Sequence, residues 1–184
     1  MTHRRMIALD LDGTLLRDDG SVDPLDAAAL QAARRAGVLI VIATGRLIDT
    51  ALEAVRALPI DGPLLCADGR VVACARTGAL LADLDRLVDV PACTKGRALA
   101  QAAARAGVLR EHVAAVGDWL NDVSMLAWAG RSFAMASAPE AVRAAATETL
   151  ATTSGAGGGV AEAVERWLAG GSVWLARGSA PWRR

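Results

Sequence analysis

The feature that most constrains this chain is an apolar run that ends in two carboxylates, within residues 6–16 (MIALDLDGTLL). Its first four residues suffice for a buried strand and are too few to cross a membrane. Asp10 and Asp12 follow two positions apart, so on a strand their side chains share a face and repel unless a proton or a cation lies between them. Gly13 then allows a tight turn. The segment predicts a strand that leads into a charged site; solvated acids at a strand end are the alternative.

The length and charge of the chain point to one globular domain with small polar ligands. A chain of 184 residues buries most of its apolar surface without disulfides or metals. Its 20 basic and 20 acidic residues argue against nucleic acid or an anionic membrane as the main partner. No stretch approaches the roughly 20 apolar residues of a membrane helix. The N-terminus (MTHRRMIALD) lacks the apolar core of a secretory signal, so we expect a cytoplasmic protein.

Cysteine and histidine offer little chemistry in this chain. Cys66, Cys74 and Cys93 are an odd number without a CxxC pair, which suggests neither a disulfide framework nor a zinc site. His3 and His112 lie far apart in the sequence. Catalysis or metal binding is therefore expected to depend on other residue types.

Strand and helix patterns alternate along most of the chain. Apolar runs predict strands at 6–9, 38–43, 112–116, 131–136 and 148–153, and a hairpin at 64–74 around Asp68-Gly69. Helical patterns cover about 24–36, 47–58, 95–106, 121–129, 139–146 and 160–169. This alternation predicts an α/β fold with a doubly wound, mostly parallel, Rossmann-like sheet. Such sheets bind ligands at the carboxyl ends of their strands.

Polar side chains follow three of the predicted strands where each one ends. They are Asp10 and Asp12, then Thr44, and then Asp118 with Asn121 and Asp122. Asp118 and Asp122 are four positions apart, so a helix starting there would turn both carboxylates to one side. Four carboxylates in one crevice repel strongly unless a hard cation with oxygen ligands lies among them. We expect that cation to be Mg²⁺.

A single lysine supports an anion at the same place. Of the 20 basic residues only Lys95 is a lysine, and the others are arginines. Thr94 can cap a helix that begins at Lys95, and a lysine in a first helical turn opposes the helix dipole. That position makes sense if an anion binds there. With a metal, a hydroxyl and free backbone N–H groups nearby, we expect the anion to be a phosphate.

Together these residues resemble the haloacid dehalogenase-like phosphohydrolases, in particular the Cof-type sugar-phosphate phosphatases. The four motifs occur in order as DLDGTLL at 10–16, ATGR at 43–46, Lys95 in TKGRALA, and GDWLNDVSML at 117–126. The resemblance covers about residues 4–168. It implies Mg²⁺-dependent hydrolysis of a small phosphorylated metabolite, similar to a sugar phosphate, through an aspartyl phosphate.

The resemblance also implies a role for each motif residue. Asp10 would be the nucleophile, and Asp12 would protonate the leaving alkoxide and then activate water. Thr44 and Lys95 would hold the transferring phosphoryl oxygens. Asp118 would bind Mg²⁺ with the Asp10 carboxylate and the Asp12 carbonyl, and Asp122 would support the metal directly or through water. The implied substrate-binding residues are Gly13, Gly45 and Arg46, through the backbone, and Asn121, which would orient Lys95 or the phosphate.

The chain departs from this branch in its cap. The branch inserts a whole cap domain between the hairpin and the lysine motif, whereas here only about 25 residues separate Asp68 from Lys95. We expect a phosphatase core at 1–169 with a cap remnant at about 68–93, and a C-terminal tail at 170–184. The crevice is then open to a bulky ester, or a neighbouring subunit of a homo-oligomer covers it. Trp119 is expected at its mouth or in the core.

Two other functions remain compatible with the same motifs. One is a catalytically silent scaffold or phospho-ligand sensor that kept the site and lost its cap. The other is a phosphomutase, which the same nucleophile permits. Hydrolysis of a generic aryl phosphate with and without Mg²⁺ separates these classes.

Overall fold

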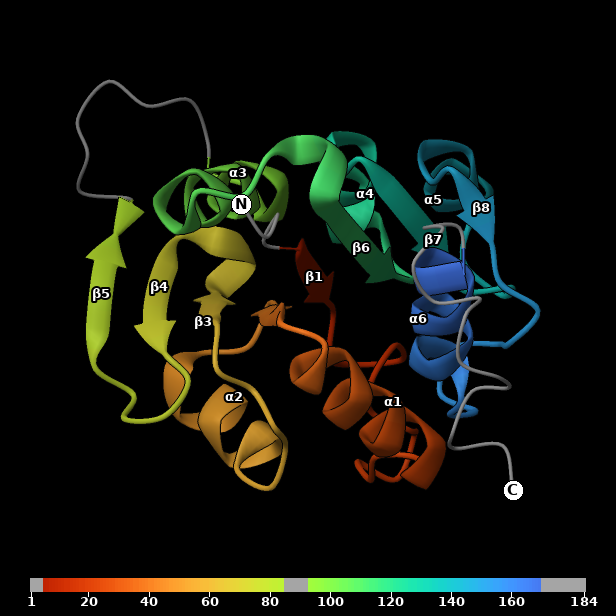
Figure 1. Cartoon of the computed structure of the whole chain (residues 1–184), viewed down its shortest axis with the longest axis horizontal. Helices are drawn as coiled ribbons and strands as arrows, with labels where there is room; N and C mark the ends of the chain where they lie inside the picture. Colours follow the sequence, from red (N-terminus) through yellow and green to blue (C-terminus); the bar gives the residue numbers. More distant parts are fainter. Residues whose placement is uncertain (1–4, 85–92, 170–184) are drawn as a thin grey trace.

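One eight-stranded sheet forms the centre of the molecule (Figure 1). The computed structural model describes residues 5–84 and 93–169. The strands are β1 (Arg5–Leu9), β2 (Val38–Ala43), β3 (Pro63–Cys66), β4 (Val71–Cys74), β5 (Leu80–Asp83), β6 (Val113–Gly117), β7 (Arg131–Ala134) and β8 (Glu148–Thr149). Their order in the sheet is β5-β4-β3-β2-β1-β6-β7-β8. The pairs β3–β4 and β4–β5 are antiparallel and the other five pairs are parallel, so the expected mostly parallel sheet is confirmed.

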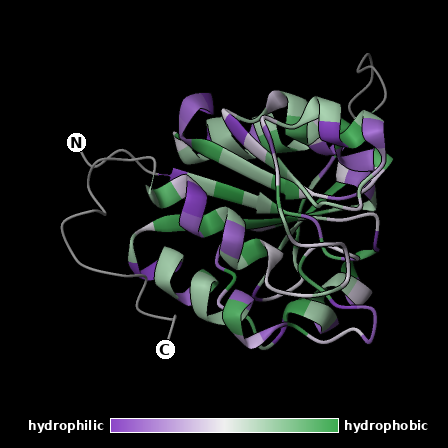
Figure 2. Ribbon diagram, turned by 90° about the vertical axis from the view of Figure 1, so that its right-hand side faces the viewer, coloured by the Kyte–Doolittle hydropathy of each residue, from purple (hydrophilic) through white to green (hydrophobic). Residues whose placement is uncertain are grey.

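Helices cover both faces of this sheet (Figure 1). They are α1 (Pro24–Arg35), α2 (Ile48–Val55), α3 (Lys95–Ala106), α4 (Val123–Trp128), α5 (Glu140–Ala145) and α6 (Gly159–Ala169). One buried cluster joins the sheet to α1, α2 and α6, and the other joins it to α3, α4 and α5. Figure 2 shows the apolar strands between these two helical layers. The chain is therefore doubly wound, as parallel strands with helical crossovers require.

The first strand is central, and its residues 6–9 are completely buried. Ile7 and Leu9 belong to the core on the α1 side, and Met6 and Ala8 to the core on the α3 side. Side chains alternate between the faces of a strand, so a strand covered on both faces has no polar position. The first carboxylate therefore appears only where β1 ends, at Asp10.

Local sequence signals explain the ends of two helices. Thr94 caps α3 by accepting a hydrogen bond from the Arg97 amide, and Gly107 ends this helix with a φ of 66°. Asp23 caps α1 in the same way, with Pro24 in the first turn. Both helices therefore begin and end close to where the sequence predicts.

Several elements differ from the sequence expectation. The segment after the hairpin forms β5, a third antiparallel strand that no clear pattern predicts. The helix expected at 47–58 spans only Ile48–Val55, and the strand expected at 148–153 shrinks to Glu148–Thr149. The helix after β6 starts later than expected, with a short 3-10 turn at Leu120–Asp122. Short or edge elements depend on neighbours rather than on their own pattern, which explains these differences.

Part of the expected cap remnant extends the sheet. The hairpin at 64–74 is confirmed as β3 and β4, and β5 pairs with β4 on its far side. Residues 85–92, which complete the remnant, and the tail at 170–184 lie outside the described residues. Among the residues that the structure describes, no helix has the length and apolar character needed to cross a bilayer.

Candidate active site

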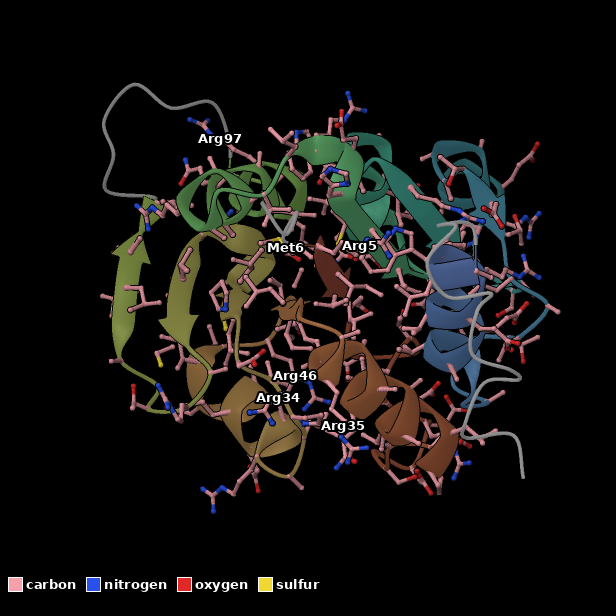
Figure 3. The ribbon with its side chains drawn as sticks, in the orientation of Figure 1. Arg5, Met6, Arg34, Arg35, Arg46 and Arg97 are labelled. Carbon is pink, nitrogen blue, oxygen red and sulfur yellow. The ribbon has the colours of Figure 1, made fainter. Side chains whose placement is uncertain are left out.

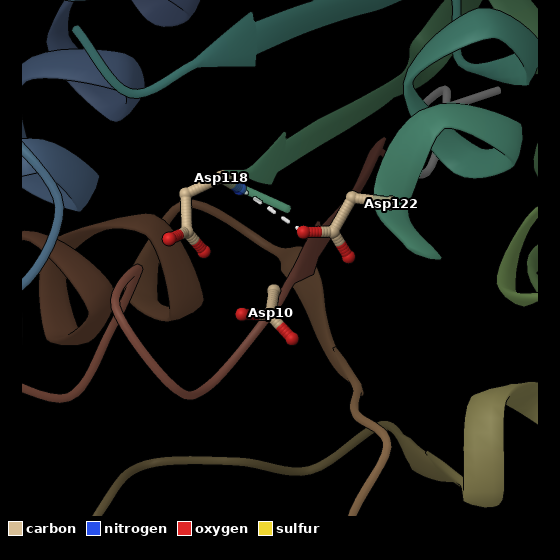
Figure 4. Close-up of side chains that lie close together, drawn as sticks. All are labelled: Asp10, Asp118 and Asp122. Carbon is tan, nitrogen blue, oxygen red and sulfur yellow. Dashed lines mark hydrogen bonds between the residues drawn. The ribbon is translucent and has the colours of Figure 1, made fainter. Parts of the chain in front are cut away.

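The candidate site lies at the carboxyl ends of the adjacent strands β2, β1 and β6, and Figure 4 shows its three buried acids. Asp10 follows β1, Asp118 follows β6, and Asp122 ends the 3-10 turn that leads into α4. Each offers one carboxylate oxygen, and these three atoms lie within 4.8 Å of one another. All three residues are buried. The sheet order therefore brings together acids that lie more than 100 positions apart in the chain.

Lys95 lies between two of these acids. Its Nζ donates to Asp10 Oδ1 and to Asp122 Oδ1, both at 2.7 Å. The side chain is fully buried at the start of α3. Burial disfavours its charge, but the two carboxylates raise the pKa of Lys95 above its ordinary value, so the ammonium stays protonated. The isolated lysine of the sequence thus lies within the acidic cluster.

Gly96 allows α3 to approach α4 closely, and this approach places Lys95 beside the acids. A Cβ atom added at Gly96 would lie 2.2 Å from the carbonyl oxygen of Ser124 at the start of α4. The Gly96 amide also donates to Ser124 Oγ at 3.1 Å. Any larger residue at Gly96 would push the two helices apart and withdraw the ammonium from the acids.

Asp122 is held firmly by the loop that precedes it. Its Oδ2 accepts hydrogen bonds from the amides of Asp118 and Trp119, both at 3.0 Å, while Oδ1 accepts from Lys95. Asp118 and Asp122 therefore lie together although Asp118 precedes the helix, and not because both share a helical face. This reason differs from the one that the spacing suggested.

Asp118 packs against the loop after β1. Its Oδ1 accepts a hydrogen bond from Thr14 Oγ1 at 2.9 Å. Gly13 has a φ of +82°, and a Cβ atom there would lie 2.5 Å from Asp118 Oδ2. Burial raises the pKa of Asp118, while hydrogen bonds from Thr14 and Ser154 oppose this rise. Gly13 is thus required both by its backbone conformation and by the close approach of Asp118.

A second cation beside Asp10, in addition to Lys95, would favour ionisation of this carboxyl group near neutral pH. Burial and repulsion from Asp122 raise the pKa of Asp10 to about 8, although Lys95 lowers it. Metal ligands act as carboxylates, so a bound divalent cation would favour the ionised form.

The donor set fits a hard divalent cation. Asp10 Oδ1 accepts a hydrogen bond from Lys95, and its second oxygen has no hydrogen-bond partner among the described residues. Asp118 accepts hydrogen bonds from Thr14 and Ser154, and a carboxylate has the capacity to accept more than two. Both oxygens of Asp122 accept hydrogen bonds, which favours its expected action through water over direct ligation. Carboxylates with spare oxygens are the ligands that Mg²⁺ prefers.

Asp12 lies nearer to the surface and pairs with Arg46. Nε of Arg46 donates to Asp12 Oδ2 at 2.9 Å, and Nη2 donates to Oδ1 at 2.5 Å. The hydrogen bond to Asp12 raises the pKa of Arg46. Figure 3 labels this arginine, which follows β2. The sequence suggests only a backbone role for Arg46. In the structure its side chain makes a bidentate contact with Asp12, the proposed acid–base residue.

Thr44 and Gly45 lie at the end of β2 beside this pair. Thr44 is fully buried, and its Oγ1 accepts a hydrogen bond from the Arg46 amide at 3.1 Å. A Cβ atom at Gly45 would lie 3.4 Å from Asp68 Oδ1 and 3.7 Å from Asn121 Nδ2. Thr44, Gly45 and Asn121 therefore lie at the same edge of the sheet as the acidic cluster.

Two residues of this edge were not predicted as site residues from the sequence. Asp68 accepts a hydrogen bond from Asn121 Nδ2 at 2.8 Å, and Ser154 donates to Asp118. Asp68 belongs to the hairpin turn and Ser154 to the glycine-rich loop, and each segment reads as an ordinary connection. The Asp68-Gly69 pair, which predicts the hairpin turn, is the one local signal that points to Asp68.

Three large apolar side chains next to the site are exposed. Trp119 is 59% exposed, and the neighbouring Leu120 is 54% exposed. Leu47, directly after Arg46, is 70% exposed. Core packing is therefore excluded for Trp119, whereas Trp128 packs against the core on the α3 side.

Two curated relatives resemble part of this chain. The pyridoxal phosphate phosphatase YbhA of Escherichia coli is 43% identical over 65 residues, which are 35% of this chain and 24% of that protein. The 5-amino-6-(5-phospho-D-ribitylamino)uracil phosphatase YcsE of Bacillus subtilis is 37% identical over 65 residues, 35% of this chain and 26% of that protein. Each match therefore spans about a quarter of the relative.

Solved structures share the fold. A haloacid dehalogenase-like hydrolase from Bacillus subtilis has a TM-score of 0.75 and 21% identity, covering 88% of this chain and 99% of its own. The deoxy-D-mannose-octulosonate 8-phosphate phosphatase of Haemophilus influenzae has a TM-score of 0.68 and 21% identity, covering 91% of this chain and 88% of its own.

A sequence model of the haloacid dehalogenase-like hydrolases matches residues 7–84 and 88–164, which is most of the chain. The matched segments contain all four motifs and the whole acidic cluster around Lys95. The expected resemblance is confirmed: the chain belongs to the haloacid dehalogenase-like hydrolase family.

Proposed function

We propose that this protein is a Mg²⁺-dependent phosphomonoester hydrolase that acts through an aspartyl phosphate on Asp10. The observation that carries the proposal is the convergence of Asp10, Asp118 and Asp122 around the buried ammonium of Lys95. Three acids alone would suit several kinds of metal site. A buried lysine at the start of a helix adds a place for an oxyanion, which a phosphate supplies.

The first half-reaction transfers the phosphoryl group to the protein. A carboxylate oxygen of Asp10 forms a bond to phosphorus as the bond from phosphorus to the ester oxygen breaks. Asp12 gives its proton to the departing alkoxide, which leaves as an alcohol. Arg46 then faces the Asp12 carboxylate that this step creates, and the bidentate contact already seen stabilises it.

The second half-reaction restores the protein. Asp12 removes a proton from a water molecule as that water attacks phosphorus, and the bond from phosphorus to Asp10 breaks. Inorganic phosphate leaves, and Asp10 is a carboxylate again. Lys95 and Thr44 would hold the phosphoryl oxygens in both halves, since charge on these oxygens must be stabilised in a loose transition state.

Asp10, Asp118 and the carbonyl oxygen of Asp12 would hold the Mg²⁺, and Asp122 would support it through water. When bound, the cation neutralises phosphoryl charge and lets two anions approach each other. Asp122 also fixes the position of Lys95 through its 2.7 Å contact. The ammonium is thereby available to the oxyanion rather than free to move.

The proposed substrate is a small phosphorylated metabolite with a sugar-like leaving group. The two curated relatives are named for pyridoxal phosphate and for a phosphorylated ribitylamino compound, both small phosphate monoesters. The main alternative is a silent protein that binds phosphate without turnover. A phosphomutase would instead transfer the phosphoryl group from Asp10 to another sugar hydroxyl group.

Hydrolysis of p-nitrophenyl phosphate tests this proposal. We expect turnover with Mg²⁺, loss of turnover on adding EDTA, and a loss of about a thousandfold or more for Asp10→Asn, because the amide cannot form the acyl phosphate. Glu140→Gln, which removes an exposed carboxylate on α5, serves as the matched control. Turnover that persists without metal or in Asp10→Asn would refute the mechanism. Phosphate binding without any turnover would favour the silent protein.

A further inference from the structure

Asp68 lies beside the segment that carries Arg46, the partner of the proposed proton donor Asp12. It is in the 3-10 turn at Ala67–Gly69, directly after β3, at the same edge of the sheet as the acidic cluster. Its Oδ1 lies over Gly45, where an added Cβ atom would approach to 3.4 Å. The next residue, Arg46, grips Asp12, the proposed donor of a proton to the leaving group. Asp68 and Asp12 therefore flank the same short segment that follows β2.

The backbone holds Asp68 in this place at some cost. Asp68 has φ 55° and ψ 30°, and Ala67 before it also has a positive φ of 49°. Side chains other than glycine rarely adopt this left-handed conformation, although aspartate and asparagine tolerate it. The Asp68 amide donates to the Thr44 carbonyl at 3.1 Å. This backbone contact connects the strained turn directly to the proposed phosphate-binding segment.

The side chain of Asp68 also forms a bridge across the crevice. It accepts a hydrogen bond from Asn121 Nδ2 at 2.8 Å, and Asn121 precedes the Asp122 that holds Lys95. A carboxylate accepts several hydrogen bonds, and among the described residues only this one reaches the Asp68 side chain. Asp68 is half-buried, so its remaining acceptor capacity is open to a ligand.

The Asp68 carboxylate forms no ion pair among the described residues. Arg46 uses two of its N–H donors in the bidentate contact with Asp12, and Asn121 carries no charge. The Asp68 carboxylate would repel an anionic group on the leaving group, whereas it would accept a hydrogen bond from a hydroxyl group there. Like charges at such a part-exposed position repel moderately and are screened by salt.

We infer that Asp68 determines the substrate class of this site: it favours leaving groups that are uncharged and carry hydroxyl groups, and it disfavours those with a second anionic group. The inference rests on the proposed phosphatase function. It assigns Asp68 a role in specificity, while the chemical step belongs to the other residues.

Two esters that differ in one group test the inference. Glycerol 3-phosphate and 3-phosphoglycerate are alike except that a hydroxymethyl group in the first is a carboxylate in the second. We expect a higher kcat/KM for glycerol 3-phosphate, by about fivefold or more at low salt. The Asp68→Asn variant keeps an acceptor for Asn121 and suits the left-handed backbone, and we expect it to reduce this preference to less than about twofold.

Controls separate charge from structural effects. Asp68→Gly also suits the backbone and removes both the charge and the bridge, so it should lose the preference as well. Glu140→Gln should keep the preference, because α5 connects β7 to β8, which lie on the other side of β1 from β3 in the sheet. The preference of the unaltered protein should shrink as salt rises from about 0.05 to 0.5 M.

Three outcomes would overturn the inference. An unchanged preference in Asp68→Asn, together with continued Mg²⁺-dependent hydrolysis, overturns the inference and leaves the proposed function standing. Equal turnover of the two esters by the unaltered protein overturns it in the same way. Failure to hydrolyse either ester or p-nitrophenyl phosphate overturns the proposed function and, with it, the role of Asp68.

Discussion

At the scale of single residues, the site depends on side chains whose partners lie on other elements. Lys95 contacts acids from β1 and from the turn before α4, and Arg46 contacts Asp12 from the neighbouring strand end. Each contact fixes a group that the proposed reaction needs in one orientation. Replacing a partner should therefore affect catalysis even where the replaced residue never touches the substrate.

Replacing Arg46 should affect esters with poor leaving groups most. Arg46→Ala removes the grip on Asp12 and the stabilisation of the carboxylate that forms as Asp12 gives up its proton. We expect kcat/KM for an alkyl phosphate to fall about tenfold, and that for p-nitrophenyl phosphate by less than about twofold, since nitrophenolate leaves without a proton.

Arg46→Lys is the matched control for this prediction. It keeps the charge but cannot make two parallel hydrogen bonds. Its kcat/KM for the alkyl phosphate should therefore lie between that of the unaltered protein and that of Arg46→Ala. An equal loss for both esters in Arg46→Ala would contradict a role in orienting the acid. It would point instead to a general weakening of phosphate binding.

At the scale of elements, one buried carboxylate joins two helices on the same face. Asp26, in the first turn of α1, accepts hydrogen bonds from the amides of Gly158 and Ala161 at the start of α6, at 2.8 and 2.7 Å. These amides have no partner within their own helix. Asp26 is fully buried, and burial raises its pKa even though the two amides lower it.

This raised pKa predicts a pH dependence of stability. A carboxyl group with a higher pKa in the folded state contributes stability that is fully present below about pH 4, the unfolded value, and is lost as the pH rises through the folded value. The Asp26→Asn variant has no carboxyl group at this position, so its stability does not fall for this reason as the pH rises. Its free energy of unfolding should therefore approach that of the unaltered protein, or exceed it, as the pH rises from about 4 to 7.

Urea unfolding at several pH values measures this difference. Asp49→Asn, an exposed carboxylate in the first turn of α2, is the control. At low pH we expect Asp26→Asn to be less stable by about 1–2 kcal/mol, because an amide accepts fewer hydrogen bonds from α6. A difference between the two proteins that stays constant with pH would contradict the raised pKa of Asp26.

At the scale of the whole molecule, exposed apolar side chains border the candidate site of the doubly wound core. The site occupies the carboxyl edge of the sheet, and the residues beside it include the exposed Trp119, Leu120 and Leu47. Between the hairpin and α3, the described chain adds only β5 to the edge of the sheet. Several exposed apolar side chains around a site indicate a surface that binds another molecule, because contact of such side chains with water is unfavourable.

We expect a second copy of the chain to cover this site. Light scattering should then give a particle mass above the 19.0 kDa of one chain. Trp119→Ala should lower both that mass and the turnover, because the cover excludes water from the reaction. Leu80→Ala on the exposed edge strand β5 is the control and should change neither. A monodisperse monomer with unchanged turnover in Trp119→Ala would instead support the open crevice.

The sequence alone determined the identity and order of the chemical groups. Asp10, Thr44, Lys95 and Asp118 each carry a local signal, namely a strand end or a helix start, and these signals depend on residues only a few positions away. The fold class followed for the same reason, because alternating strands and helices leave few ways to bury both faces of a sheet.

Only the tertiary structure decided which of these groups touch. The contacts of Arg46 with Asp12 and of Asp68 with Asn121 join segments 34 and 53 positions apart, and no local pattern encodes either one. The edge strand β5 and the two-residue β8 likewise exist because a neighbouring strand offers hydrogen bonds. Contacts of this kind arise from the packing of the whole sheet, which brings distant strand ends together only once the core has formed.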